Sequence, residues 1–225
     1  MRLITGIKER ILNNSFIFEM VTAWISIFGR NKIKGRKNNS VQYKGARLKK
    51  CHINIMGMDN TVLIKEGCKL FASTIQISGN NNVVVIGNRS TLYGTTITIE
   101  DGQNQVTIGD MTVVYEKTEL AATEGTKIMI GSDCLISSEV DIRTGDSHAI
   151  LNQAGERINP AKDVIINNHT WIGTRATILK GTILGENCVV GTGAIVTKSY
   201  PEKGNVLAGI PAKIVEKGIT WNETR

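Results

Sequence analysis

The sequence predicts an all-β fold in which short parallel strands wind into a three-sided solenoid. An aliphatic residue recurs every 22 positions in the first half of the chain, at Ile64, Ile86, Ile108 and Ile130. Further along, the spacing tightens to six, at Ile166, Ile172, Ile178, Leu184, Val190 and Val196. Fixed periods of this kind are typical of repeat architectures. An aromatic content of only 5% also suits the thin aliphatic core of a solenoid.

Length and composition narrow the class of protein. A chain of 225 residues can form one ordinary domain or two small ones. It is 41% hydrophobic and 21% charged, with 23 glycines and only 3 prolines. Disordered, collagen-like and polytopic membrane chains have other compositions, so we expect a soluble globular protein.

The first 40 residues are expected to form a separate helical and basic segment. Apolar residues fall on one helical face, at Leu3, Ile7, Ile11, Phe18, Val21, Ile25 and Phe28. The densest stretch, 16–28, is shorter than the span of about 20 apolar residues that crosses a bilayer. The helix therefore packs on the main domain or on a neighbouring subunit, or it docks on a membrane surface with Trp24 as an anchor.

Basic residues are concentrated between Arg30 and Lys50. This stretch holds nine lysines and arginines and no acidic residue, whereas the rest of the chain has 18 basic and 20 acidic residues. Because the excess is so local, we expect no binding to nucleic acid. Peripheral association with the inner membrane through residues 1–50 is a second expectation for a chain that is otherwise cytoplasmic.

Each repeat unit is expected to be a short strand and a turn, with two inward side chains four residues apart. Three strands give a coil of 18 residues, and the 22-residue period adds four residues at one corner. These corners contain Asn60, Asn82 and Asn104, which we expect to stack as a hydrogen-bonded ladder. Asparagine tolerates the left-handed backbone of a tight corner. The helix and the C-terminal segment would then cap the solenoid.

The four cysteines are predicted to be reduced. Cys68, Cys134 and Cys188 fall at the small inward position of their repeats and are interpreted as core residues, and no cysteine pair, Cys51 included, has C-x-x-C spacing. A metal site is the weaker alternative, because thiolates on separate coils lack the clustered spacing of zinc ligands.

The repeat breaks between Ile142 and Ile166, where the interval is 24 residues instead of six. A long excursion is therefore predicted over residues 143–165. Loops on a rigid scaffold often carry chemistry. This one contains His148, one of only three histidines, with Asp146 close by in sequence.

Motifs in the second half of the chain resemble those of a known family. The hexads I-G-T-R-A-T, L-G-E-N-C-V and V-G-T-G-A-I-V, followed by A-G-I-P-A-K at 208–213, resemble the left-handed β-helix hexapeptide-repeat acyltransferases. The resemblance covers about residues 60–215. It implies a left-handed parallel β-helix over 41–215, a C-terminal cap, a tail over 216–225, and a homotrimer with active sites between subunits.

The motifs D-S-H, G-E-R-I-N-P-A-K and W-I-G resemble the active-site region of sugar and polysaccharide O-acetyltransferases, such as those acting on capsule and O-antigen. There the matching histidine is the general base, so the resemblance implies that His148 takes the proton of an acceptor hydroxyl. An imidazole with an ordinary pKa of ~6.5 is mostly neutral at pH 7 and can accept it. Asp146 is expected to orient the ring, with Asp141 as the alternative.

The resemblance also implies acetyl-CoA as the acetyl donor, and no metal. Trp171 in W-I-G would line the donor or acceptor groove, or else pack between subunits. The pantetheine is expected beside the backbone at Gly173, Thr174, Gly191, Thr192, Gly193 and Ala194. Candidates for contacts to the phosphates are Lys180, Lys198 and Lys213.

The predicted function is direct transfer of an acetyl group from acetyl-CoA to a saccharide hydroxyl. An N-acetyltransferase of nucleotide-linked amino sugars is the first alternative. A metal-dependent lyase of the carbonic-anhydrase type is remote, because His52, His148 and His169 show no matching spacing, and His169 is interpreted as a surface or packing residue. A non-catalytic β-helix would need neither the excursion nor the outward Trp171.

Overall fold

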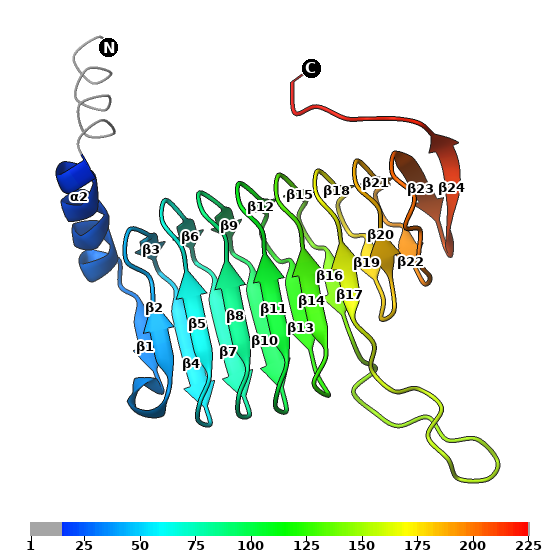
Figure 1. The fold of residues 1–225 in the computed structure, drawn as a ribbon, viewed down its shortest axis with the longest axis horizontal. Coiled ribbons are helices and arrows are strands. Elements are labelled where there is room, and N and C mark those ends of the chain that lie inside the picture. The colour runs from blue at the N-terminus through cyan, green and yellow to red at the C-terminus, as the bar shows by residue number, and fades with distance from the viewer. Residues whose placement is uncertain (1–14, 225) are drawn as a thin grey trace.

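The computed structural model describes residues 15–224, which form a three-sided parallel β-solenoid with one α-helix at its start (Figure 1). The first sheet contains β1 (Lys32–Lys34), β4 (His52–Met56), β7 (Thr74–Ser78), β10 (Thr96–Glu100), β13 (Glu119–Ala122), β16 (Asp141–Arg143), β19 (Thr177–Ile178) and β22 (Ile195–Val196). The second contains β2 (Ser40–Gln42), β5 (Thr61–Ile64), β8 (Val83–Ile86), β11 (Gln105–Ile108), β14 (Lys127–Ile130), β17 (Val164–Ile166) and β20 (Ile183–Leu184). The third contains β3 (Arg47–Lys49), β6 (Lys69–Phe71), β9 (Thr91–Tyr93), β12 (Val113–Val114), β15 (Leu135–Ile136), β18 (Trp171–Ile172), β21 (Val189–Val190), β23 (Asn205–Gly209) and β24 (Ala212–Lys217).

The predicted all-β class and the three-stranded coil are confirmed. From β4 to β22, each strand pairs in parallel with the strand numbered three lower, for example β8 with β5, where Ile86 lies beside Ile64. The repeat positions of the sequence are thus the inward positions of successive coils, and both of these isoleucines are buried. Strands of the first sheet are longer in the early coils, so the four extra residues of the 22-residue period lie at the corner between the first and second sheets.

The asparagine ladder is present at that corner. Asn82 Nδ2 donates to Asn60 Oδ1 at 3.0 Å, and Asn104 Nδ2 donates to Asn82 Oδ1 at 3.1 Å. Asn39 extends the ladder by one step, because its Oδ1 accepts from Asn60 Nδ2 at 2.9 Å. The left-handed backbone falls one residue earlier than each ladder asparagine, at Asp59, Asn81 and Gln103. The ladder asparagines therefore stabilise the corner through their side chains.

The cysteines are free and buried, as predicted. Burial raises the pKa of the Cys68 and Cys134 thiols to about 11. At neutral pH both stay protonated and fill small inward positions of the core.

Helix α2 (Ser15–Phe28) lies against the first coil and covers the free edge of β3. The Ser26 hydroxyl donates to Ala46 O at 3.0 Å and accepts from Leu48 N at 3.1 Å. Asn31 Nδ2 donates to Leu48 O at 2.9 Å. Within residues 15–224, no helix has the length and apolar character needed to cross a bilayer. The expected helical face at Leu3, Ile7 and Ile11 lies outside the described residues.

The other end of the solenoid is closed by a hairpin. β23 continues the third sheet in parallel with β21, and β24 folds back antiparallel on β23. The motif A-G-I-P-A-K forms the turn of this hairpin. The strands of the solenoid run from Lys32 to Lys217, and its first strand, β1, pairs with β4.

Candidate active site

The irregular segment between β16 and β17 projects from the corner between the first and second sheets (Figure 1). Its outer part is a small hairpin, in which Leu151 pairs with Arg157 and Ile158 N donates to Ile150 O at 2.9 Å. His148 lies in the arm that leaves β16. The chain departs from the coil here because the inward positions at 148, 154 and 160 hold no aliphatic side chain that could fill the core.

A buried asparagine fixes the base of this loop. Asn159 Nδ2 donates at 2.8 Å both to Asp146 Oδ2 and to the main-chain oxygen of His148. Its Oδ1 accepts from Ile150 N at 2.7 Å. Asn159 therefore binds three positions of the arm that carries the histidine, and it holds the backbone of His148 in place.

The following coil contributes a lysine to the same cluster. Lys180, just after β19, donates to Asp146 Oδ2 and, at 3.0 Å, to Asn159 O. The ammonium group of Lys180, with the amide of Asn159, holds the pKa of Asp146 below its usual range. Lys180 was expected at a phosphate, but the structure places its ammonium group against the loop.

The preceding corner contributes a glutamate. Arg157 Nη1 donates to Glu124 Oε2 at 3.0 Å, and Ala161 N donates to the same carboxylate at 3.2 Å. These hydrogen bonds lower the pKa of Glu124. The loop is thus attached to the preceding coil through Glu124 and to the following coil through Lys180. The sequence analysis predicted neither the contact of Glu124 nor the hydrogen bonds of Asn159.

His148 itself is exposed, and its imidazole makes no hydrogen bond to any residue between 15 and 224. Asp146 accepts from Asn159 and Lys180 instead of from the ring. Asp141 pairs with Arg143, whose Nη2 lies 2.7 Å from Asp141 Oδ2. Neither carboxylate therefore orients the imidazole within the part of the chain that the structure describes, and the ring is open to solvent.

A hollow of about 170 Å³ lies on the first sheet at the foot of the loop. Its lining includes Thr98, Glu119, Arg143 and Ser147, the residue next to His148. Thr98 Oγ1 already donates to Glu119 Oε1 at 3.2 Å. Hydroxyl, carboxylate and guanidinium groups can exchange hydrogen bonds with sugar hydroxyls.

The residues predicted to bind the acetyl donor form a strip at the corner between the third and first sheets. Gly173 and Thr174 follow β18, and the segment 191–194 follows β21 one coil later. Gly193 N donates to Thr174 O at 2.9 Å. A Cβ on Gly173 would lie 2.7 Å from Thr192 N, so glycine is required there for the coils to stack. A Cβ on Gly193 would meet nothing within 4 Å, so this edge of the strip is open.

Trp171 faces outward on the third sheet, 38% exposed, and its Nε1 donates to Ser137 Oγ at 3.3 Å. The tail brings a second indole beside it, because the ring of Trp221 lies 6.1 Å from that of Trp171. Trp221 stacks on His169 at 4.5 Å, and His169 Nδ1 lies 2.8 Å from Asp133 Oδ2. His169 packs against the tail, as expected from the sequence. No sequence pattern predicted that Trp221 would lie beside it.

The remaining predicted residues are not gathered around His148. Lys198 lies after β22 with its ammonium group 5.7 Å from the Tyr200 ring, and Lys213 is exposed on β24. The three histidines also lie on different parts of the fold: His52 is in β4, a regular strand of the repeat, His148 is in the loop, and His169 precedes β18. The structure brings together no group of three histidine, cysteine or carboxylate side chains within residues 15–224 that could hold a metal ion.

Comparison with known proteins places this geometry in a family. Residues 163–198 match the hexapeptide repeat of succinyl-transferase. Two curated relatives are called polysialic acid O-acetyltransferase: one from Escherichia coli O1:K1, 37% identical over 45% of this chain and 33% of its own, and one from Neisseria meningitidis, 38% identical over 46% and 48%. The crystal structure of the polysialic acid O-acetyltransferase OatWY superimposes with a TM-score of 0.81 and 34% identity, over 87% of this chain and 91% of that one.

The chain spans between a third and a half of the length of these curated relatives. The structural match, in contrast, covers nearly the whole of both chains, and it establishes the handedness that the repeat spacing left open. The chain belongs to the left-handed β-helix, hexapeptide-repeat acetyltransferase family.

Proposed function

We propose that this protein transfers an acetyl group from acetyl-CoA to a hydroxyl group of a saccharide, and that the acceptor is a bacterial surface polysaccharide or its precursor. The observation that carries the proposal is the exposed His148 on a loop clamped by Asn159 and Lys180. The relatives named as polysialic acid O-acetyltransferases support the acceptor class.

In the proposed reaction, His148 accepts the proton of the acceptor hydroxyl as its oxygen attacks the thioester carbonyl. The new ester C–O bond forms, the C–S bond breaks, and the proton leaves with the thiolate or with solvent. Because the acetyl group passes directly to the acceptor, no cysteine nucleophile is needed. A cysteine nucleophile would have to be a thiolate, whereas the four cysteines are buried and their thiol pKa values are raised.

We further propose that the donor lies along the strip formed by Gly173, Thr174 and the segment 191–194, with Trp171 beside it. The open position at Gly193 and the exposed Trp171 ring fit a long, narrow ligand. Exposed Lys198 and Lys213 supply positive charge for its phosphates. Lys180 binds Asp146 and the main chain of Asn159 in the loop that carries His148. Lys180 and Asp146 therefore act as positioning residues for His148.

The strip and His148 lie on different corners of the solenoid, and this separation supports a homotrimer. Transfer requires the imidazole and the thioester to meet, and a loop that reaches a neighbouring subunit would bring them together. Association with an anionic membrane would place the enzyme near lipid-carried precursors, and the basic stretch from Arg30 to Lys50 supports it.

The test is acetyl transfer measured by mass spectrometry with acetyl-CoA and a panel of polysaccharides, free sugars and UDP-amino sugars. An ester product is released by hydroxylamine, whereas an amide is stable. We expect an ester on a saccharide, and we expect His148→Ala to abolish it while the matched control His52→Ala keeps wild-type activity. An amide product, or full activity in His148→Ala, would overturn the proposal.

A further inference from the structure

Helix α2 presents a large apolar face to solvent. Met20, Trp24, Ile27 and Phe28 are 59%, 63%, 74% and 66% exposed, and their spacing places them on one side of the helix. The Trp24 and Phe28 rings are in contact, with centroids 5.1 Å apart. A contiguous exposed apolar cluster of this kind indicates an interaction site.

The coil beside this helix is strongly basic. No acidic residue occurs between Arg30 and Met58. Exposed cations of the first coil and its turns include seven side chains: Arg30, Lys32, Lys34, Arg36, Lys37, Lys49 and Lys50. We call these seven cations and the four apolar side chains of α2 the N-terminal end face.

These residues lie at the same end of the molecule. β1, β2 and β3 are the terminal strands of their sheets, and α2 packs against β3 (Figure 1). The end face therefore combines an apolar helix with the cations of a single coil, about 4.8 Å thick. This is the composition of surfaces that bind the interface of an anionic bilayer.

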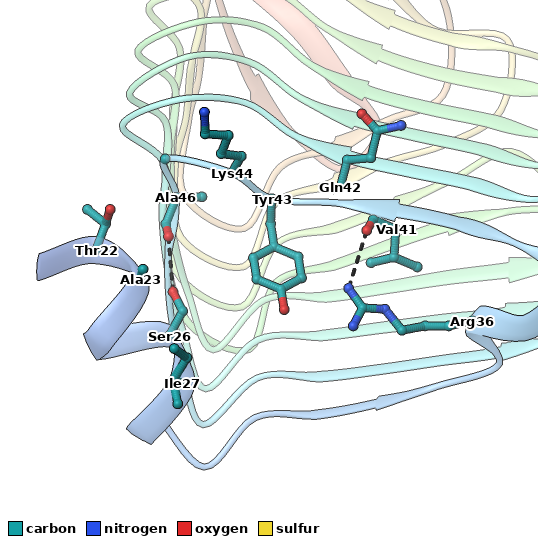
Figure 2. A pocket seen from close by; sticks show the side chains of 11 residues that line it. Thr22, Ala23, Ser26, Ile27, Arg36, Val41, Gln42, Tyr43, Lys44 and Ala46 are labelled. Carbon is teal, nitrogen blue, oxygen red and sulfur yellow. Dashed lines mark hydrogen bonds between the residues drawn. The ribbon is translucent and has the colours of Figure 1, made fainter. Parts of the chain in front are cut away.

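A cavity of about 510 Å³ separates α2 from the chain around β2 (Figure 2). Ile27 from the helix and Val41 and Tyr43 from the coil contribute apolar lining. The Arg36 guanidinium lies 5.5 Å from the Tyr43 ring centroid and donates to Val41 O at 3.4 Å. An apolar cavity with a cation at its edge suits an acyl chain below a phosphate group.

We propose that the N-terminal end face docks on an anionic phospholipid bilayer. The apolar side chains of α2 enter the boundary between headgroups and acyl chains, and the cations of the first coil face lipid phosphates. A second copy of the chain is a poor occupant, because it would bring two sets of seven exposed cations together. Charge complementarity selects the anionic surface.

Docking on this face would set the height of the candidate active site. Five steps along the first sheet separate β1 from β16, and each step is about 4.8 Å, so the loop begins roughly 24 Å from the first coil. This part rests on the proposed acetyl transfer: with the solenoid upright on the membrane, His148 acts on sugar units well away from a lipid anchor. The acceptor is then a polymer and not a lipid-linked monosaccharide.

The test is flotation of the full-length protein with vesicles of phosphatidylcholine alone or with 40% phosphatidylglycerol as a chosen composition. We expect binding to the anionic vesicles only, weakened by salt. Trp24→Ser with Phe28→Ser, and separately Lys32→Glu with Lys34→Glu, should lower the partition coefficient by about tenfold or more. The matched control Lys203→Glu with Lys217→Glu makes the same charge change at the opposite end and should bind like wild type.

Absence of wild-type binding, or an equal loss in the control pair, would overturn the docking proposal. So would a dimer in sedimentation that the Trp24 and Phe28 changes dissociate, because the face would then bind a second copy. Vesicle binding by His148→Ala should match wild type, and the end-face variants should acetylate soluble saccharide normally. Failure of acetyl transfer in wild type therefore affects the proposed function and not the docking measurement.

Discussion

Asn159 donates hydrogen bonds of 2.8 Å to the carboxylate of Asp146 and to the main-chain oxygen of the neighbouring His148. A side chain from the returning arm of the loop thus fixes the backbone of the arm that carries the imidazole. The imidazole makes no hydrogen bond to residues 15–224, so the loop positions the backbone of His148 and leaves its ring accessible.

Asn159→Ala should reduce kcat by about 10- to 100-fold, because a displacement of about 1 Å at a reacting group has an effect of this size. The measurement is steady-state transfer to a saccharide acceptor. Asn152, whose hydrogen bonds stay within the exposed tip of the loop, provides the control. Equal losses in Asn159→Ala and Asn152→Ala would argue against a clamp at the base.

Lys180→Met should raise the pKa of Asp146 towards the ordinary carboxylate range. The pKa of Asp146 is lowered in the folded chain, so its contribution to loop stability is complete above the ordinary carboxylate pKa and is lost as pH falls through the lowered value. In the variant the folded-state pKa lies closer to the ordinary value, so the contribution is smaller and its loss is complete at a higher pH. A titration of the Asp146 carboxyl carbon by NMR measures the shift, with Lys162→Met as control, and an unchanged pKa would contradict the ion pair.

Trp221 lies beside Trp171, which we propose borders the acetyl-CoA strip, so the two indoles together would form one wall of the donor site. Trp221→Ala should therefore raise KM for acetyl-CoA by roughly 2- to 10-fold with little change in kcat, since aromatic contacts contribute modestly beyond their buried area. Trp221→Phe should retain most of the affinity through its stack on His169. Kinetics with varied acetyl-CoA, and with Glu223→Ala as a control in the same tail, separate the two constants. A fall in kcat at unchanged KM would place Trp221 outside the donor site.

Asn82→Ala should destabilise the solenoid by roughly 2–4 kcal/mol, because buried partners on both sides lose hydrogen bonds. Urea denaturation followed by circular dichroism gives the change in the free energy of unfolding. Gln76→Ala, at an exposed position one strand away, should change it by less than about 0.5 kcal/mol. Similar midpoints for the two variants would show that the ladder contributes little.

Much of the fold could be predicted from sequence because its regularities are local. Inward residues recur at fixed spacing along each strand, so Ile64 and Ile86 identify stacked coils without any tertiary information. The same spacing showed where the coil fails, and hence where the loop with His148 must leave it. The motif W-I-G gave the outward Trp171 for the same reason.

Other features depend on how separate corners align in space. Nothing in the sequence indicates that Glu124 meets Arg157, that Lys180 meets Asp146, or that the tail returns to stack Trp221 on His169. Each of these contacts joins residues more than 30 positions apart, and one partner in each contact lies outside the repeat, in the loop (Arg157, Asp146) or in the tail (Trp221). Their side chains have no periodic position from which a partner can be inferred.

The sequence by itself determined the three-sided solenoid, its asparagine ladder, its buried thiols and the place of the excursion, because the alternation of side chains in a strand converts spacing directly into burial. Tertiary structure alone decided which carboxylate faces which cation. It paired Asp146 with Lys180 and left the imidazole of His148 without a hydrogen bond to residues 15–224. Ion pairs and ring stacks form between whichever side chains the folded backbone brings within a few ångströms, and that proximity is a property of the coil packing and of the tail.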